Sequence, residues 1–371
     1  MNNNKILFVS NTANFSKFNL PFINWFKQQG WIVDYASSAE EEIKLVDNNF
    51  KIDIVRNPFS KNNIRAIKEL QKLIKQEGYR IVHCHAAVAG FVTRIACKNL
   101  RKRGVKVIYT THGFNFYKGA PFINNTLYFY IEKKLSKYTD ILVTINNEDY
   151  QVASKEFYTK EIVKIDGVGV DLDKFKAFEK MARQKLRKNY GYNKNDFILL
   201  YIAEFIPRKN HKMLFEILPD LRKDIPNLKL ILCGKGELLE DLKNKAKELN
   251  ISEVIDFAGY RKDINNICNI SDVYVTTSFQ EGLPISVVEA MSSGLPIVAS
   301  RIRGQVDAIT DGRNGFLFDV NSSEDLKKSI YKLYENPELT MKFSKNNITD
   351  SIRFSVNIAV ESMSKIYKTI M

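Results

Sequence analysis

Residues 278–299, SFQEGLPISVVEAMSSGLPIVA, constrain the fold more than any other stretch of this chain. An apolar run at 273–277 leads into them, a Gly-Leu-Pro turn follows at 282–284, and a second apolar run begins at Pro296. Pro284 suits the first position of a helix. The N–H group of a residue at that position has no partner within the helix, and proline has no N–H group. The stretch therefore predicts a strand, a turn, a helix that begins at Pro284 and a second strand.

Two carboxylates bracket the start of this helix. Glu281 precedes it on the loop, and Glu289 lies inside it, on the same face as Ser286. The free N–H groups at the helix start form a site that favours an anion such as a phosphate. Two solvated surface glutamates are the general alternative. The small residues later in the helix allow close packing on a sheet and favour a functional pair.

The segment EGLPISVVEAMSSGLPIVA resembles the E-x7-E signature of the family 4 retaining glycosyltransferases. This resemblance implies the α/β GT-B architecture, with two Rossmann-like domains facing across a cleft. It also implies that Glu281 contacts the transferred sugar as a catalytic residue and that Glu289 binds the ribose of the nucleotide. The other donor-binding residues predicted at this turn are Gly282, Leu283, Pro284 and Ser286.

Short apolar runs alternate with segments of helical period through the first half of the chain. The runs lie at 5–10, 31–36, 52–55, 81–85, 105–110 and 141–145. This alternation predicts a parallel sheet with right-handed crossovers. Ligands of such sheets bind beyond the carboxyl ends of the strands, so the residues that follow each strand are the candidates for a site.

Three residues in such positions are site candidates. Asn14 follows the first run in a loop without glycine, where many family members have a glycine-rich loop, and we predict that it binds the acceptor, as does His85. His112 belongs to a THGF stretch that resembles a segment of bacterial capsule and exopolysaccharide transferases, which implies a catalytic histidine near the donor sugar. A structural role is the alternative for His112. A metal site at His83 and His85 lacks a third ligand nearby.

The second half repeats the pattern of a strand followed by basic or glycine-rich residues. Arg208 and Lys209 follow the run at 197–203, and Lys209 matches a family lysine that meets the donor diphosphate. Glu204 stands where the family usually has an arginine, so Arg208 is expected to substitute for it. Gly234 and Gly236, after the run at 228–233, are further donor-binding candidates, although a lone G-x-G is a weak signal.

The resemblance covers nearly the whole chain and sets the expected domains. Residues 1–172 form an acceptor-binding domain, residues 173–352 bind the nucleotide sugar, and a C-terminal helix at 353–371 crosses back to the first domain. The class typically needs no metal, and we expect no cofactor. The four cysteines lack close pairing and suit reduced thiols in a cytosol, and the apolar run at the N-terminus is too short for a signal peptide.

The formal net charge of +14 calls for an anionic partner or a basic surface. No pattern typical of nucleic-acid-binding modules occurs, so we expect no nucleic acid as partner. An anionic membrane surface attracts basic residues, and the segment 121–138 combines aromatic residues and lysines with an apolar helical face. Two alternatives stay open: a merely basic surface, and a helix packed on the sheet with its lysines outward.

These observations lead to one functional hypothesis and its rivals. The chain is expected to move a sugar, with retention, from a nucleotide donor to a lipid-diphosphate-linked saccharide in capsule, exopolysaccharide or O-antigen synthesis. The donor is expected to be a UDP-sugar, such as a UDP-N-acetylhexosamine, and the location the cytoplasmic face of a bacterial plasma membrane. The rivals are a GT-B sugar-nucleotide epimerase, a glycogen-type phosphorylase, and a non-enzymatic basic protein that binds membranes or nucleic acid.

Overall fold

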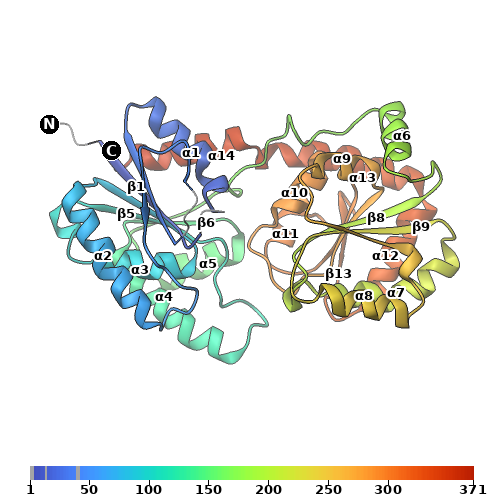
Figure 1. The fold of residues 1–371 in the computed structure, drawn as a ribbon, viewed down its shortest axis with the longest axis horizontal. Helices are drawn as coiled ribbons and strands as arrows, with labels where there is room; N and C mark the ends of the chain where they lie inside the picture. The colour runs from blue at the N-terminus through green and yellow to red at the C-terminus, as the bar shows by residue number, and fades with distance from the viewer. Residues whose placement is uncertain (1–3, 13–14, 39–41) are drawn as a thin grey trace. The chain divides into compact units, whose positions relative to one another are not determined.

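The computed structural model describes residues 4–12, 15–38 and 42–371 (Figure 1). The chain divides into two compact units: unit 1 comprises Met1–Gly169 and Val356–Met371, and unit 2 comprises Val170–Ser355. Each unit is a parallel sheet covered by helices, which confirms the predicted pair of Rossmann-like domains. Among the described residues, no helix combines the length and the apolar character that a bilayer span requires.

The sheet of unit 1 has the strand order β3-β2-β1-β4-β5-β6-β7, with every neighbouring pair parallel. Its strands are β1 (Lys5–Val9), β2 (Ile32–Ser37), β3 (Asn48–Lys51), β4 (Ile81–His85), β5 (Lys106–Thr110), β6 (Ile141–Thr144) and β7 (Glu161–Lys164). The central strands are buried on both faces, as their apolar sequences require.

Helices lie on both faces of this sheet (Figure 1). They are α1 (Ser16–Gln28), α2 (Lys61–Glu77), α3 (Ala87–Cys97), α4 (Phe129–Leu135), α5 (Asn147–Glu156) and α14 (Val356–Lys368). Local sequence sets their ends: Ser60 caps the start of α2 by accepting the Asn62 N–H, and Gly78 ends it in the left-handed conformation with φ +69°. A short π-helical segment, η3 (Asn124–Tyr128), leads into α4.

The last helix, α14, packs on unit 1 beside α1. The Tyr367 hydroxyl lies 2.9 Å from Nδ1 of His83 on β4, and the Tyr367 ring stacks on Trp25 of α1 at 5.6 Å between centroids. The final residues of the chain thus complete the core of the unit that the first residues begin.

The edges of the sheet differ from the sequence prediction. The run predicted as a strand at 52–55 follows β3 rather than forming it, and β7 was not predicted. Both strands lie at edges, where β3 consists of the polar residues NNFK and β7 is only partly buried. Edge strands carry little of the apolar pattern on which strand prediction depends, because one side of each pairs with nothing.

Unit 2 contains a six-stranded parallel sheet with the order β10-β9-β8-β11-β12-β13. Its strands are β8 (Phe197–Ile202), β9 (Leu228–Cys233), β10 (Ile255–Gly259), β11 (Val273–Thr276), β12 (Ile297–Ser300) and β13 (Gly315–Phe318). The order reverses between β8 and β11, as it does between β1 and β4 in unit 1. Each sheet therefore has a topological switch point, where two chain segments leave in opposite directions and open a crevice.

The helices of unit 2 cover both faces of its sheet. They are α6 (Lys180–Asn189), α7 (His211–Asp224), α8 (Leu239–Glu248), α9 (Ile264–Ile270), α10 (Ile285–Ser292), α11 (Gln305–Ala308), α12 (Ser323–Glu335) and α13 (Pro337–Ser351). The helix of the E-x7-E segment is α10. It begins one residue later than predicted, because Pro284 has an extended backbone, with ψ at 113°, and acts as the N-cap.

A buried ion pair joins α3 to α4 in unit 1. Nη1 of Arg94 lies 2.8 Å from Oε2 of Glu132, and the side chains are only 1% and 9% exposed. The Arg94 guanidinium also lies over the ring of Tyr109, 4.1 Å from its centroid. Burying two charges is costly, so this pair fixes the position of α4 more than it adds to stability.

We predict that Glu132→Gln lowers the free energy of unfolding of unit 1 by about 3–5 kcal/mol, because it leaves the Arg94 charge buried without a counter-charge. The double variant Arg94→Met, Glu132→Leu should recover most of this loss. Both tryptophans of the chain, Trp25 and Trp31, lie in unit 1, so their fluorescence during urea unfolding reports on this unit alone. Equal stability of Glu132→Gln and wild type would contradict the prediction.

Candidate functional site

The switch point of unit 2 brings together the loops that follow β8 and β11. The first loop carries Arg208 and Lys209 in a short 3-10 turn, and the second carries Glu281 before α10. The two loops are directly bonded, since the N–H of Phe279 donates to the carbonyl of Arg208 at 2.9 Å. Residues more than seventy positions apart thus share one edge of the sheet.

Glu281 is the centre of this edge. Oε1 of Glu281 lies 2.5 Å from Nζ of Lys209, and Oε2 lies 3.4 Å from Nη1 of Arg208. The Glu281 side chain is 10% exposed, whereas that of Arg208 is 38% exposed and also donates to the carbonyl of Gln280 at 2.7 Å. Two cations therefore converge on one carboxylate at the start of a helix, and the same cations could neutralise a diphosphate.

Glycines let the surrounding backbone segments approach closely. A Cβ atom on Gly234 would lie 1.9 Å from the carbonyl oxygen of Ala203, and one on Gly236 would lie 2.5 Å from that of Phe205. The predicted G-x-G thus lies against the loop that follows β8. Glu204 is exposed on that loop, next to these contacts, so its carboxylate is open to solvent.

The turn before α10 is held from the next loop, after β12. Nε of Arg303, which is buried, donates to the carbonyl of Glu281 at 3.1 Å. A Cβ atom on Gly304, where φ is +77°, would lie 2.1 Å from the carbonyl oxygen of Gly282. The sequence analysis assigned a site role to neither Arg303 nor Gly304. The only signal for them was an Arg-Gly pair just after the second strand of the motif.

The start of α10 presents the other predicted donor residues. Gly282 and Leu283 are partly exposed, and Pro284 is buried. The Tyr274 hydroxyl, from β11, donates to Oγ of Ser286 at 2.8 Å and fixes that side chain at the helix start. These residues lie at the start of an eight-residue helix, whose first N–H groups favour an anion.

Glu289 lies one turn further into α10 and is partly buried. Burial raises its pKa to about 7, and the positive charge of Lys174 only partly offsets this effect. Its environment therefore differs from that of Glu281, which has two cationic partners. The two carboxylates of the motif are not equivalent.

The candidate residues of unit 1 also lie towards the carboxyl ends of strands. His83 and His85 lie on one face of β4 with ring centroids 4.1 Å apart, and Nδ1 of His85 lies 3.2 Å from Nε2 of His112, which follows β5. Burial lowers the pKa of His112 to about 4 and that of His83 to about 3. Both rings are therefore neutral at pH 7. The described part of the chain contains no group of three or more residues arranged to hold a metal.

The loop after β4 is strained beside these histidines. Ala86 has φ +68° and ψ +158°, a conformation that is costly for a residue with a Cβ atom, and it is the N-cap of α3. Asn11, in the loop after β1, accepts the N–H of Ala89 at 3.0 Å and so takes part in the start of α3. The sequence did not single out Asn11. Asn14, which it did predict, lies outside the described residues.

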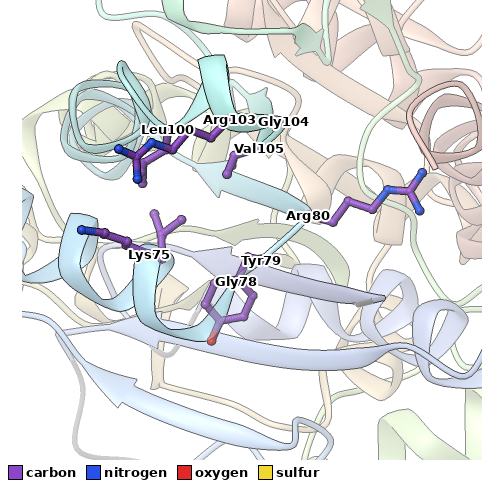
Figure 2. Close-up of a pocket in the computed structure, with 9 residues that line it drawn as sticks. Lys75, Gly78, Tyr79, Arg80, Leu100, Arg103, Gly104 and Val105 are labelled. Atoms are coloured by element: carbon purple, nitrogen blue, oxygen red, sulfur yellow. The ribbon is translucent and has the colours of Figure 1, made fainter. Parts of the chain in front are cut away.

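A cavity of about 360 Å³ lies in unit 1, at the end of the sheet opposite to the histidines (Figure 2). Its lining includes Arg80 and Val105, which precede β4 and β5, so it opens at the amino ends of these strands. In Figure 2 the side chain of Arg80 points away from those of Lys75 and Arg103. The cavity is thus separate from the edge with the histidines, and its cations do not converge.

Two family models match this chain. The model of glycosyl transferases group 1 matches residues 182–350, and that of glycosyl transferase 4-like domains matches residues 5–146. The Bacillus subtilis protein named "Putative glycosyltransferase EpsD" is 39% identical over 99% of this chain and 97% of its own length. An Escherichia coli UDP-Gal:alpha-D-GlcNAc-diphosphoundecaprenol alpha-1,3-galactosyltransferase is 29% identical over 92% of this chain and 87% of its own.

Solved structures agree on the fold. The Anabaena protein Alr3699/HepE, crystallised with UDP and glucose, superposes with a TM-score of 0.81 at 19% identity, over 98% of this chain and 99% of its own. Sucrose-phosphate synthase from Thermosynechococcus elongatus gives 0.82 at 15% identity, over 99% and 98% of the two chains. With the two sheets, the E-x7-E edge and these matches, the chain belongs to the group 1, family 4-type glycosyltransferases of GT-B architecture.

Proposed function

We propose that this glycosyltransferase moves a sugar from a UDP-sugar to a lipid-diphosphate-linked saccharide, with retention of the anomeric configuration and without a metal or other cofactor. The arrangement that carries the proposal is the convergence of Lys209 and Arg208 on Glu281 at the start of α10. In this role both cations bind the donor diphosphate, together with the backbone around Gly234, Gly236 and the turn at 282–284. Glu281 contacts the sugar, and Glu289 binds the ribose.

The reaction needs the charge of the leaving nucleotide to be stabilised as the bond to the sugar breaks. Lys209, Arg208 and the start of α10 supply that stabilisation, which is usually the largest contribution to such catalysis. No side chain is assigned as a nucleophile. The acceptor hydroxyl attacks from the face that the nucleotide leaves, and its proton passes to the departing phosphate oxygen.

His112 acts as a neutral group in this scheme. With a pKa of about 4 it carries no charge at pH 7, so it offers one hydrogen bond to a sugar hydroxyl without competing with the cations for the diphosphate. Its Nε2 lies 3.2 Å from Nδ1 of His85, so one of these two nitrogens donates the hydrogen bond and the other accepts it. His85 is assigned to binding the acceptor, and so is Asn14 from its place in the sequence.

Two related enzymes support a lipid-linked acceptor. Besides the E. coli galactosyltransferase, a Campylobacter jejuni N,N'-diacetylbacillosaminyl-diphospho-undecaprenol alpha-1,3-N-acetylgalactosaminyltransferase is 28% identical over 72% of this chain and 69% of its own. An acceptor of this kind lies in a membrane. We therefore place the protein at the cytoplasmic face of a bacterial plasma membrane, in capsule, exopolysaccharide or O-antigen synthesis, with an anionic lipid surface and not nucleic acid as its partner.

We predict that Glu281→Gln lowers kcat by about a hundredfold or more, because the contact to the sugar is lost where charge develops. The affinity for UDP should not fall, since the neutral amide no longer competes with the diphosphate for Lys209 and Arg208. Steady-state kinetics and calorimetric titration with UDP measure the two effects separately.

Lys209→Met is the companion variant, and it should weaken UDP binding by about tenfold or more through the loss of a charge-assisted hydrogen bond. Glu240→Gln, on an exposed position of α8, should change neither quantity. A Glu281→Gln enzyme with normal kcat would remove Glu281 from the reaction.

We predict that Glu289→Gln stabilises unit 2 at pH 8 and weakens UDP binding. The pKa of Glu289 is raised on folding, so the wild-type protein loses stability as the pH rises from the ordinary value of 4.5 through about 7. Removing the charge should return up to about 3 kcal/mol at pH 8, and nothing below pH 4.5. Loss of the carboxylate should cost about tenfold in UDP affinity.

Urea unfolding followed by circular dichroism at pH 8 and pH 4.5 tests the stability part, with Glu240→Gln as the control. Equal gains at both pH values would assign the effect to packing rather than to the charge. Unchanged UDP affinity at pH 8 would contradict the role on the ribose.

The donor, the stereochemistry and the metal requirement are open to a direct test. A panel of nucleotide sugars, assayed with a short polyprenyl-diphosphate saccharide, should show transfer from a UDP-sugar, and the product NMR spectrum should show a retained anomeric configuration. EDTA should leave the rate unchanged. Inverted product would reject the retaining mechanism, and loss of activity that Mg²⁺ restores would reject a metal-free one.

A further inference from the structure

An exposed apolar edge lies on the segment that leads into α4 of unit 1. It consists of four side chains that we call the apolar rim: Phe122, Ile123, Leu127 and Tyr130, which are 83%, 58%, 40% and 59% exposed. Leu127 belongs to the π-helical segment η3, and Tyr130 belongs to α4. Four large apolar side chains within nine residues make a patch, and patches of this kind usually mark an interaction surface.

Hydrogen bonds and an ion pair hold the segment that carries the rim in place on unit 1. Nδ2 of Asn124 donates to the carbonyl of Asn115 at 2.8 Å, and Oδ1 of Asn125 accepts the N–H of Tyr117 at 3.1 Å. One turn later Glu132 forms the buried ion pair with Arg94. In the amphipathic segment 121–138, Glu132 and Leu135 thus face the protein, while the rim faces outward.

Positive charge surrounds the rim. Residues 117–138 contain four lysines and one acidic residue, Glu132, which is buried in its ion pair. Lys118, Lys134 and Lys137 are exposed, and Nζ of Lys137 lies 4.5 Å from the centroid of the exposed Tyr158 ring. Lys133 is paired with Glu156 at 2.8 Å. Aromatic and aliphatic side chains flanked by lysines match a lipid surface that is apolar inside and anionic at its headgroups.

The rim is also continuous with the candidate site of unit 1. Asn124 and Asn125, which lie between the rim residues, bond to Asn115 and Tyr117 in the loop after β5 that contains His112. Tyr128 and Ile131 line a small cavity of about 70 Å³ together with Ala87 and Val88, which follow β4. The segment that carries the rim therefore lies next to the carboxyl end of β4.

We propose that the apolar rim inserts into an anionic membrane, with Lys118, Lys134 and Lys137 on its headgroups, and so brings the carboxyl edge of unit 1 to the lipid surface where a lipid-linked acceptor lies. The inference rests on the proposed function in one respect: a lipid-linked acceptor gives the reason for docking. Its evidence, the exposure and charge of residues 117–138, is independent of the reaction.

Vesicle binding of the full chain tests this surface. Wild type should bind vesicles of equimolar phosphatidylcholine and phosphatidylglycerol, and Phe122→Ser, Ile123→Ser should lower the partition coefficient by about tenfold or more. Met181→Ser is the matched control, because Met181 is also 83% exposed but lies on α6 of unit 2, and it should bind as wild type does. Tryptophan at position 122, in Phe122→Trp, should show a blue-shifted emission on these vesicles.

The charges are tested in the same way. Lys134→Glu, Lys137→Glu should weaken binding to the anionic vesicles by roughly tenfold or more, and should bring it close to the binding to phosphatidylcholine alone. Lys243→Glu, Lys245→Glu on α8 is the control for net charge, and it should have a smaller effect.

Three results would overturn the docking surface: no binding to anionic vesicles, equal binding by Phe122→Ser, Ile123→Ser and wild type, or a rim variant that changes the sedimenting mass and so covers a contact between two copies. Transfer to a short water-soluble acceptor separates this inference from the proposed function. A failure of docking leaves that transfer intact, and a failure of the proposed function abolishes transfer while rim-dependent vesicle binding persists.

Discussion

The convergence of Lys209 and Arg208 on Glu281 organises the carboxyl edge of the unit 2 sheet. Its geometry follows from the strand order, since only a switch point between β8 and β11 brings the loops after these strands together. The glycines around it let the neighbouring backbone close in, and Arg303 holds the carbonyl of Glu281 from the third loop. Without a ligand, the carboxylate neutralises cations that would otherwise repel one another. In the proposed reaction a diphosphate replaces it there, and Glu281 then becomes available to a sugar.

The two glutamates of the motif differ in what stabilises their charge. Glu281 is held by two cations, whereas Glu289 is partly buried and its pKa is raised to about 7. A carboxylate that its own protein solvates poorly is ready to accept hydrogen bonds from a ligand. Such a residue costs stability in the free protein, as residues at binding sites commonly do. The strained backbone of Ala86 has a similar cost to stability in unit 1.

Much of this arrangement could be predicted from the sequence. The strands β4 and β9 lie at the predicted residues, because continuous apolar runs mark buried parallel strands. The polar edge strand β3 could not be predicted in this way. Neither could the pairing of Lys209 with Glu281, nor the contact from Arg303, because both depend on which strands are neighbours in the sheet. The segment 121–138 was ambiguous for a related reason: its pattern could not show which residues Arg94 would draw inward.

Because α14 belongs to unit 1, the two units differ in when they can fold during synthesis on the ribosome. All of unit 2, Val170–Ser355, is synthesised before Val356–Met371, and its two ends are adjacent, since the N–H of Val170 bonds to the carbonyl of Phe354. Unit 2 can therefore fold as soon as it emerges. Unit 1 starts first but must wait for Tyr367 to reach His83. Unit 1, which carries the apolar rim, is thus completed only after unit 2 has been synthesised.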